Sequence, residues 1–140
     1  MATNANLNKQ PIGWVRQTST ITAAQTLVDT DSGTVYFISN ASGAHEITLP
    51  TTLTAGVNYE FYVLENTPGA AITIAAGSAI VDLVMKDAGG DASNSTAGTA
   101  VSNIIIGTSA EQGDWVRLIT DGNTWYATAL SGINNAITTS

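Results

Sequence analysis

The stretch that decides the fold class is GDWVRLITDGNTWYATA, residues 113–129. It is typical of two β-strands, each carrying a tryptophan, that meet at Asp121-Gly122. An Asp-Gly pair favours the positive backbone angles of a two-residue type I′ turn, so the pattern predicts a β-hairpin.

Two registers of this hairpin stay open. A two-residue turn places Leu118 opposite Trp125 and Arg117 opposite Tyr126, whereas a three-residue turn with a bulge at Gly122 places Trp125 opposite Arg117. In both cases each side of the strand pair carries large apolar or aromatic groups. A strand pair of this kind is covered on both sides. We expect one cover to be the protein's own core and the other to be a second subunit.

The rest of the chain repeats this pattern of short strands between turns. NYEFYVLE, residues 58–65, alternates Tyr59, Phe61 and Val63 with polar and apolar neighbours, and no segment shows a convincing helical stripe. Strands are expected at 14–17, 20–28, 34–39, 45–49, 59–65, 71–75, 79–86, 100–107, 114–120 and 124–130. The prediction is an all-β fold, an antiparallel β-sandwich or jelly-roll-like domain with an extended N-terminal arm.

The 140 residues predict one domain. Residues 1–12 are expected to form the extended arm and 13–131 the single β-domain. Within it, the low-complexity stretch 87–99 is expected to be a flexible loop. The tail, residues 132–140, is expected to pair with another element or another subunit.

Composition excludes several function classes. Charged residues make up 11% of the chain and its net charge is −7. The only basic residues, Lys9, Arg16, Lys86 and Arg117, are scattered, which argues against a nucleic-acid binder. The chain has no cysteine, and no apolar run is long enough for a secretory signal or a membrane span. We expect synthesis in the cytoplasm and no membrane partner.

Catalytic and metal sites are not indicated. His45 is the only histidine, so a His-based triad or a zinc site would lack partners. Glu60, Glu65, Asp82 and Asp114 are candidates for a glycosidase carboxylate pair, but no spacing selects two of them. DTDSG, residues 29–33, has a calcium-like spacing without the closing Glu and is explained as a turn. We expect no enzyme activity, no metal and no cofactor.

The tryptophans Trp14, Trp115 and Trp125 allow two interpretations. Each can fill a core or a subunit contact, since a buried tryptophan removes much apolar area from water. Alternatively, they form a platform on which a sugar stacks. The sequence favours the first interpretation.

The order of motifs resembles a β-rich structural module of tailed-phage virion proteins. The matching positions are Ile47 to Pro50, Gly56, Tyr59, Phe61, Ile72 to Ile74, Gly113 to Trp115, Asp121, Gly122, Trp125 and Tyr126. The resemblance covers about residues 33–130. It implies a non-enzymatic β-structure, often trimeric, of the kind found in fibres, spikes and capsid-decorating proteins.

Within that family, two features favour a capsid decoration (cement) protein. We expect the 140 residues to be a complete chain, whereas fibres usually carry the module at the end of a longer one. The polar arm and the short tail suit contacts with neighbouring capsid subunits. The expected protein is a homotrimer on the capsid surface of the virion that binds the major capsid protein and stabilises the head. The alternative is a tail fibre, spike or baseplate component that binds a host glycan. Partner or subunit contacts are expected at Trp14, Arg16, Trp115, Arg117 and Tyr126.

Overall fold

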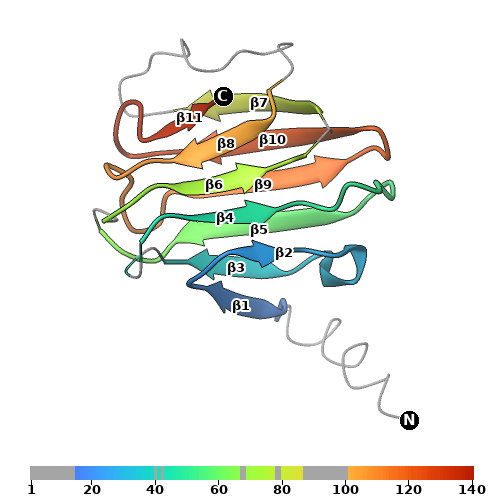
Figure 1. Cartoon of the computed structure of the whole chain (residues 1–140), viewed down its shortest axis with the longest axis horizontal. Helices are drawn as coiled ribbons and strands as arrows, with labels where there is room; N and C mark the ends of the chain where they lie inside the picture. The colour runs from blue at the N-terminus through green and yellow to red at the C-terminus, as the bar shows by residue number, and fades with distance from the viewer. Residues whose placement is uncertain (1–14, 40, 42, 67–68, 78–79, 87–100) are drawn as a thin grey trace.

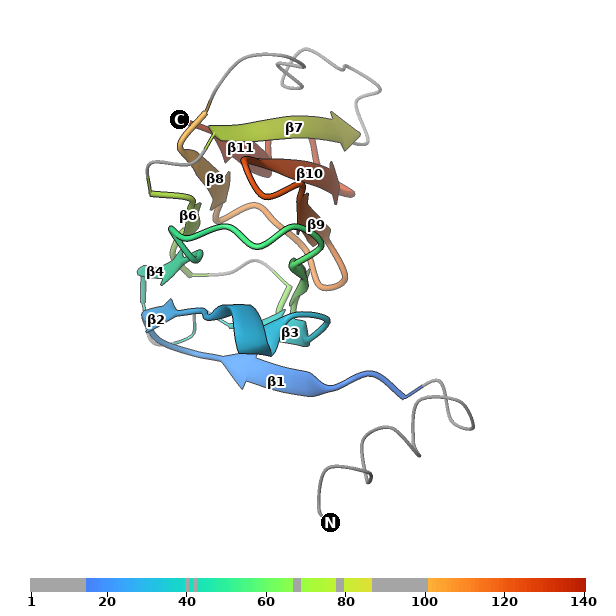
Figure 2. The same ribbon diagram turned by 90° about the vertical axis from the view of Figure 1, so that its right-hand side faces the viewer.

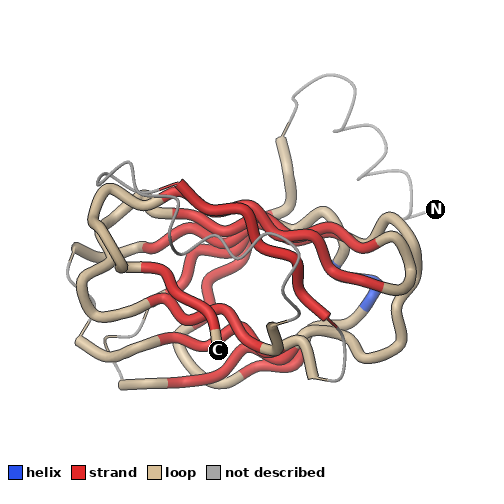
Figure 3. Tube along the Cα trace, turned by 90° about the horizontal axis from the view of Figure 1, so that it is seen from above, coloured by secondary structure: helices blue, strands red, loops and turns tan. Residues whose placement is uncertain are grey.

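A computed structural model describes residues 15–39, 41, 43–66, 69–77, 80–86 and 101–140. Two β-sheets face each other and enclose the core (Figures 1 and 3). The six-stranded sheet has the order β1 (Thr18–Ile21), β3 (Val35–Ile38), β5 (Asn58–Val63), β9 (Trp115–Thr120), β10 (Thr124–Leu130) and β7 (Ile80–Lys86). The five-stranded sheet has the order β11 (Ile137–Thr139), β8 (Asn103–Ile106), β6 (Ile72–Ala75), β4 (His45–Thr48) and β2 (Gln25–Thr26). The helical element η1 is a single turn, Asp29–Asp31.

The first six strands form a two-sheet coil. The chain crosses from one sheet to the other after every strand, so that β1, β3 and β5 are parallel neighbours in one sheet and β2, β4 and β6 in the other (Figure 2). Parallel neighbours need a crossover connection, and here the strand in the opposite sheet supplies it.

The later strands close the sandwich with mostly antiparallel pairs. β8 pairs with β6, β9 with β5, β10 with β9, and β11 with β8 in this way, whereas β7 runs parallel to β10. The structure therefore confirms the all-β sandwich, with mixed strand pairing where sequence analysis expected antiparallel pairing. The single-strand periodicity is the same for both kinds of pairing, so it could not distinguish them.

The core lies between an isoleucine layer and an aromatic layer. The five-stranded sheet contributes Ile47, Ile72, Ile74, Ile104, Ile106 and Ile137, all buried. The six-stranded sheet contributes Tyr36, Tyr59, Phe61, Val116, Leu118 and Trp125, which are also buried. The alternation expected for 58–65 and 71–75 is confirmed.

Tyr59 is central to the aromatic layer. Its ring centroid lies 5.7 Å from that of Trp125, and its hydroxyl donates a hydrogen bond to the carbonyl of Val28 at 2.9 Å. Burial, together with Asp29 nearby, raises the pKa of Tyr59. The hydroxyl therefore stays protonated and satisfies a carbonyl of the loop before η1.

Two expected segments differ at the chain ends. Residues 15–17 form no strand, and the expected strand 20–28 divides into β1 and β2 in opposite sheets, because the chain bends at Ala23. The tail pairs within the chain, since β11 adds to β8 as the outer strand of the five-stranded sheet. The expected arm 1–12 and loop 87–99 lie outside the described residues.

The hairpin adopts neither expected register. Thr120 pairs with Trp125 and Ile119 with Tyr126, so the loop residues are Gly122 and Asn123. The Asp121 carboxylate accepts hydrogen bonds from the main-chain N–H groups of Asn123 and Thr124, both at 2.8 Å. These bonds hold Asp121 before the turn, and Gly122 takes the positive φ of +98°.

The faces of the hairpin are nevertheless as expected for the two-residue turn. Each residue of β9 meets a partner two positions further along β10 than that register placed it, and a shift of two keeps every side chain on its own face. Leu118 and Trp125 point into the core, whereas Arg117 and Tyr126 are exposed.

The two tryptophans of the hairpin are expected to differ sharply in their contribution to stability. Trp125 is fully buried, so Trp125→Ala should lower the free energy of unfolding by about 3–5 kcal/mol. Trp115 lies half-buried on the opposite side, and Trp115→Ala should cost about 1 kcal/mol. Urea unfolding of both variants measures the difference. Equal losses would contradict this core.

Candidate interaction surface

The candidate site is the outer face of the six-stranded sheet, which points away from the core. It is formed by alternate residues of the strands, which the ladder registers place side by side. Its members are Phe37, Glu60, Tyr62, Trp115, Arg117, Ile119, Tyr126, Thr128, Leu130 and Lys86. Arg16 reaches the same face from the segment before β1.

An apolar row crosses this face. Phe37, Tyr62, Trp115 and Leu130 are successive register partners on β3, β5, β9 and β10. The rings of Phe37 and Tyr62 lie 6.2 Å apart. Phe37 and Leu130 expose 37% and 42% of their surface, so the row offers apolar contact area to a partner.

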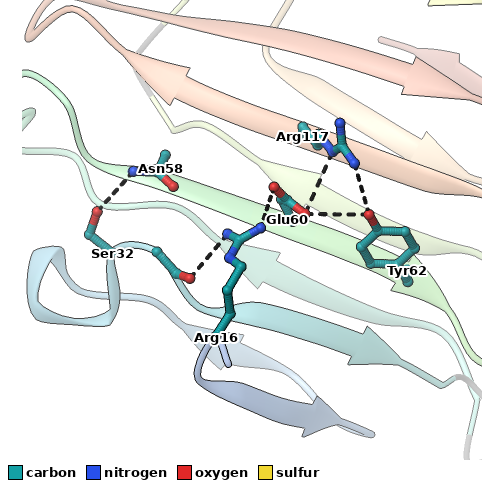
Figure 4. A network of polar contacts seen from close by, with 7 residues as sticks. Arg16, Ser32, Asn58, Glu60, Tyr62 and Arg117 are labelled. Atoms are coloured by element: carbon teal, nitrogen blue, oxygen red, sulfur yellow. Dashed lines mark hydrogen bonds and ion pairs between the residues drawn. The ribbon is translucent and has the colours of Figure 1, made fainter. Parts of the chain in front are cut away.

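A charged cluster lies beside the row (Figure 4). The Glu60 carboxylate is 2.5 Å from Nη1 of Arg16 and 3.5 Å from Nε of Arg117. Arg16 also donates to the carbonyl of Gly33 at 3.1 Å, and Tyr62 donates to Glu60 at 3.4 Å. Because one carboxylate faces two guanidinium groups, the cluster carries a net positive charge.

Arg117 joins the cluster to the apolar row. It donates a hydrogen bond to the Tyr62 hydroxyl at 3.0 Å, and its Cζ lies 4.4 Å from the centroid of the Trp115 ring. The bond to Tyr62, with Glu60 nearby, raises the pKa of the Arg117 guanidinium. A sugar that stacked on this side of Trp115 would have to displace a paired cation.

A hollow of about 250 Å³ opens on the same face near the hairpin turn. Asn58, Glu60, Arg117, Ile119 and Tyr126 are among the residues that line it. Ile119 and Tyr126 expose 51% and 46% of their surface, and the Tyr126 hydroxyl donates to the Asp121 carboxylate at 3.1 Å. The hollow therefore combines an exposed aliphatic group, an exposed aromatic ring and polar groups.

The opposite face of the molecule has a different character. On the outer side of the five-stranded sheet, Glu46, Thr73, Ile105 and Thr138 form a cross-strand row that is mostly polar. The apolar row is therefore particular to the six-stranded sheet.

The structure brings together four of the five residues that sequence analysis assigned to contacts. Arg16, Trp115, Arg117 and Tyr126 share the outer face, while Trp14 lies outside the described residues. Sequence analysis assigned no contact to Phe37, Ile119 or Leu130, and it treated Glu60 only as a carboxylate candidate. Alternation predicted the correct side of β5 and of the two hairpin strands. Only the order of the strands in the sheet makes these sides one surface.

The carboxylate candidates whose side chains the structure describes have structural partners. Glu65 accepts a hydrogen bond from Ser39 Oγ. Asp114 is buried and accepts hydrogen bonds from Ser131 Oγ at 2.7 Å and from the Gly132 N–H at 2.8 Å, which fixes the loop after β10. Glu60 pairs with cations, and the Asp82 side chain lies outside the described part of the structure. Trp125 is in the core, so it forms no sugar platform.

The remaining candidates lie apart from the outer face. The Asp29 carboxylate accepts a hydrogen bond from Thr54, and Asp31 accepts one from the Val28 N–H at 3.2 Å. The described residues contain no group of three or more His, Cys, Asp or Glu side chains that could hold a metal ion. His45 begins β4, with Nδ1 3.3 Å from the carbonyl of Gly43.

The comparisons with known proteins add no assignment. No family model matches the chain, and no curated protein matches it significantly. Among the described residues, no helix has the length and apolar character needed to cross a membrane.

The hairpin turn beside the hollow is expected to respond to pH through Asp121. Hydrogen bonds from the N–H groups of Thr124 and Asn123, and from Tyr126, lower the pKa of this carboxyl. A lowered pKa in the folded state stabilises the fold above the ordinary Asp range near about 3.9, and the stabilisation is lost as the pH falls through the lowered value.

Wild type should therefore melt above Asp121→Asn at neutral pH, and the gap should close as the pH falls through the lowered pKa of Asp121, because protonation makes both side chains neutral. Thermal unfolding of the pair across this range measures the effect, and the shared carboxylates cancel in the difference. A gap that does not change with pH would show that the Asp121 charge contributes nothing.

Proposed function

We propose that this chain is a non-enzymatic structural protein of a phage virion, a capsid decoration protein that binds the major capsid protein as a homotrimer and stabilises the head. Two lines support the proposal: the resemblance of the motif order to virion modules, and the exposed outer face of the six-stranded sheet.

The residues that carry the resemblance are mainly those that build the fold. Ile47, Tyr59, Phe61 and Trp125 are fully buried in the core, and Gly122 serves the hairpin turn. The resemblance therefore bears on the architecture, and the contact surface has to be argued from the outer face itself.

The observation that carries the proposal is the apolar exposure on this face. Ile119, Tyr126 and Leu130 each expose more than 40% of their surface on two adjacent strands. Apolar groups gathered on one sheet face favour burial against another protein, because covering them removes apolar area from water. The proposed contact places the apolar row and the hollow under a subunit or the shell.

Charge favours a partner surface of a particular kind. Arg16, Lys86 and Arg117 are the basic side chains among the described residues, and all three lie at this face of a chain with net charge −7. The face thus fits an apolar surface that carries carboxylates.

A pair of surface variants tests the proposal on virions of the phage that encodes the chain. Ile119→Glu should reduce occupancy of the head and the heat resistance of virions, because it places a carboxylate in the buried contact. Thr138→Glu, which lies opposite Ile105 on the polar face of the other sheet, is the matched control and should leave both unchanged.

Three-dimensional reconstruction of intact virions by cryo-electron microscopy locates the protein directly. Density on the head at three-fold lattice positions is the expected result. Density confined to the tail, or virions that keep full heat and osmotic resistance without the protein, would contradict the decoration role.

A second candidate is a tail component that binds a host glycan, and the hollow at Tyr126 favours it. An exposed tyrosine ring beside Asn58 and Arg117 offers a stacking surface together with hydrogen-bond donors for sugar hydroxyls. This function would be selected if the isolated protein binds host polysaccharide, Tyr126→Ala abolishes the binding, and Thr138→Glu leaves it unchanged.

A further inference from the structure

The coil of the first six strands ends at β1 and β2, which together are called the open rung below. β1 is the terminal strand of the six-stranded sheet and β2 that of the five-stranded sheet, and both lie at the same end of the molecule (Figures 1 and 2). Among the described residues, β1 has β3 as its single strand neighbour and β2 has β4. One end of the sandwich therefore presents two sheet edges together.

The hydrogen bonds of β1 define which of its main-chain groups face outward. Gln17 and Ile21 accept through their carbonyls from Val35 and Ser39 of the β3 segment, both at 2.9 Å. Because the N–H and C=O groups of a strand alternate in direction, those of Thr18 and Thr20 point away from β3. On β2, the Leu27 N–H donates to the carbonyl of Thr48, so the groups of Thr26 point outward in the same way.

The open rung lacks the features that usually block strand addition. Residues 17–28 contain no charged residue and no proline, although the chain as a whole has a net charge of −7. Thr18, Ser19 and Thr20 are all exposed. Proteins usually protect such edges with charges, prolines or bulges, and an uncharged, accessible edge is a template for another strand.

The edge is also complementary to itself. In an antiparallel pair of two β1 strands centred on Ser19, Thr18 of each copy stands opposite Thr20 of the other. Both residues present outward N–H and C=O groups, so each pair exchanges reciprocal hydrogen bonds, and the threonine side chains meet in favourable cross-strand pairs.

We propose that two copies of this chain associate edge to edge through β1, in antiparallel register about a two-fold axis at Ser19. An axis normal to the sheets maps each sheet onto its own plane, so the same operation brings β2 toward β2 of the other copy. The six-stranded sheet then continues across the contact, and no like charges meet along residues 17–28.

This association is independent of the proposed virion function. It uses the strand edges and leaves the outer face of the six-stranded sheet accessible. The pairing can therefore occur whether or not that face also binds a subunit or a shell, and each contact can be lost without the other.

A proline at the edge gives the first test. Thr20→Pro removes an N–H that points outward and leaves the ladder to β3 intact, which edge strands tolerate. Sedimentation equilibrium of the full chain over a concentration series should give half the molar mass of wild type, with an unchanged melting temperature measured on dilute samples. Ser19→Pro removes an N–H that faces β3 and should lower the melting temperature instead.

Complementary charges give the second test. The double variant Thr18→Lys with Thr20→Lys should not self-associate, nor should Thr18→Glu with Thr20→Glu, because like charges face each other across the axis. An equimolar mixture of the two should restore the wild-type mass. Thr108→Lys, in an exposed loop, is the control and should associate as wild type does.

Amide hydrogen exchange locates the contact. The Thr18 and Thr20 amides should become more protected as the wild-type concentration rises, and both should exchange fast on dilution. In Thr20→Pro, the remaining Thr18 amide should exchange fast at every concentration. Several results would overturn the proposal: the same mass for wild type and Thr20→Pro, no recovery on mixing, or protection at Thr18 and Thr20 that does not depend on concentration. The last result would mean that another part of the same chain covers the edge.

Discussion

The packing of an isoleucine layer against an aromatic layer holds this molecule together. Ile72, Ile74 and Ile104 from one sheet lie buried opposite Tyr59, Phe61 and Trp125 from the other. Because the chain changes sheet after each of the first six strands, successive strands contribute to the two layers in turn. The strands are short, and a short strand pair alone is marginal in water, so each depends on the opposite layer for its stability.

The same alternation that builds the core also builds the outer face. Every inward residue of β5 and β9 has an outward neighbour, and on the six-stranded sheet several of these are aromatic or aliphatic. Glu60 is central to this face because its carboxylate forms ion pairs with both Arg16 and Arg117. The Arg117 guanidinium in turn lies over the Trp115 ring. The charged groups pair with one another, which lowers the cost of covering them with a partner. The polar outer side of the five-stranded sheet lacks this combination.

The two ends of the sandwich are closed differently. At one end the C-terminal segment adds β11 to β8, and β7 adds to β10, which places a strand with charged residues at the edge of the six-stranded sheet. At the other end the coil stops at β1 and β2, with uncharged segments and outward main-chain groups. In a parallel coil, the outward N–H and C=O groups of each strand bond to the next strand of the same sheet. The terminal strands β1 and β2 have no such next strand within the coil. Among the described residues, the end of the coil therefore combines regular geometry with main-chain groups that no neighbouring strand pairs.

The sequence by itself determined the fold class and the two sides of most strands. The alternation in NYEFYVLE and the hairpin 113–129 predicted which residues are buried, and contacts expected at Arg16, Trp115, Arg117 and Tyr126 fall on one surface. Periodicity is a property of one strand and its two sides, so it requires no knowledge of neighbours.

Only the tertiary structure decided the strand order, the mixed pairing and the hairpin register. Strand order depends on which layer each segment packs against, and this is settled by contacts between residues far apart in the chain. The register shifted because the Asp121 carboxylate binds the N–H groups of Asn123 and Thr124, which moved the turn one residue along. The apolar row also depends on the tertiary structure. Hydrogen bonds between strands, and not spacing along the chain, place Phe37, Tyr62, Trp115 and Leu130 side by side.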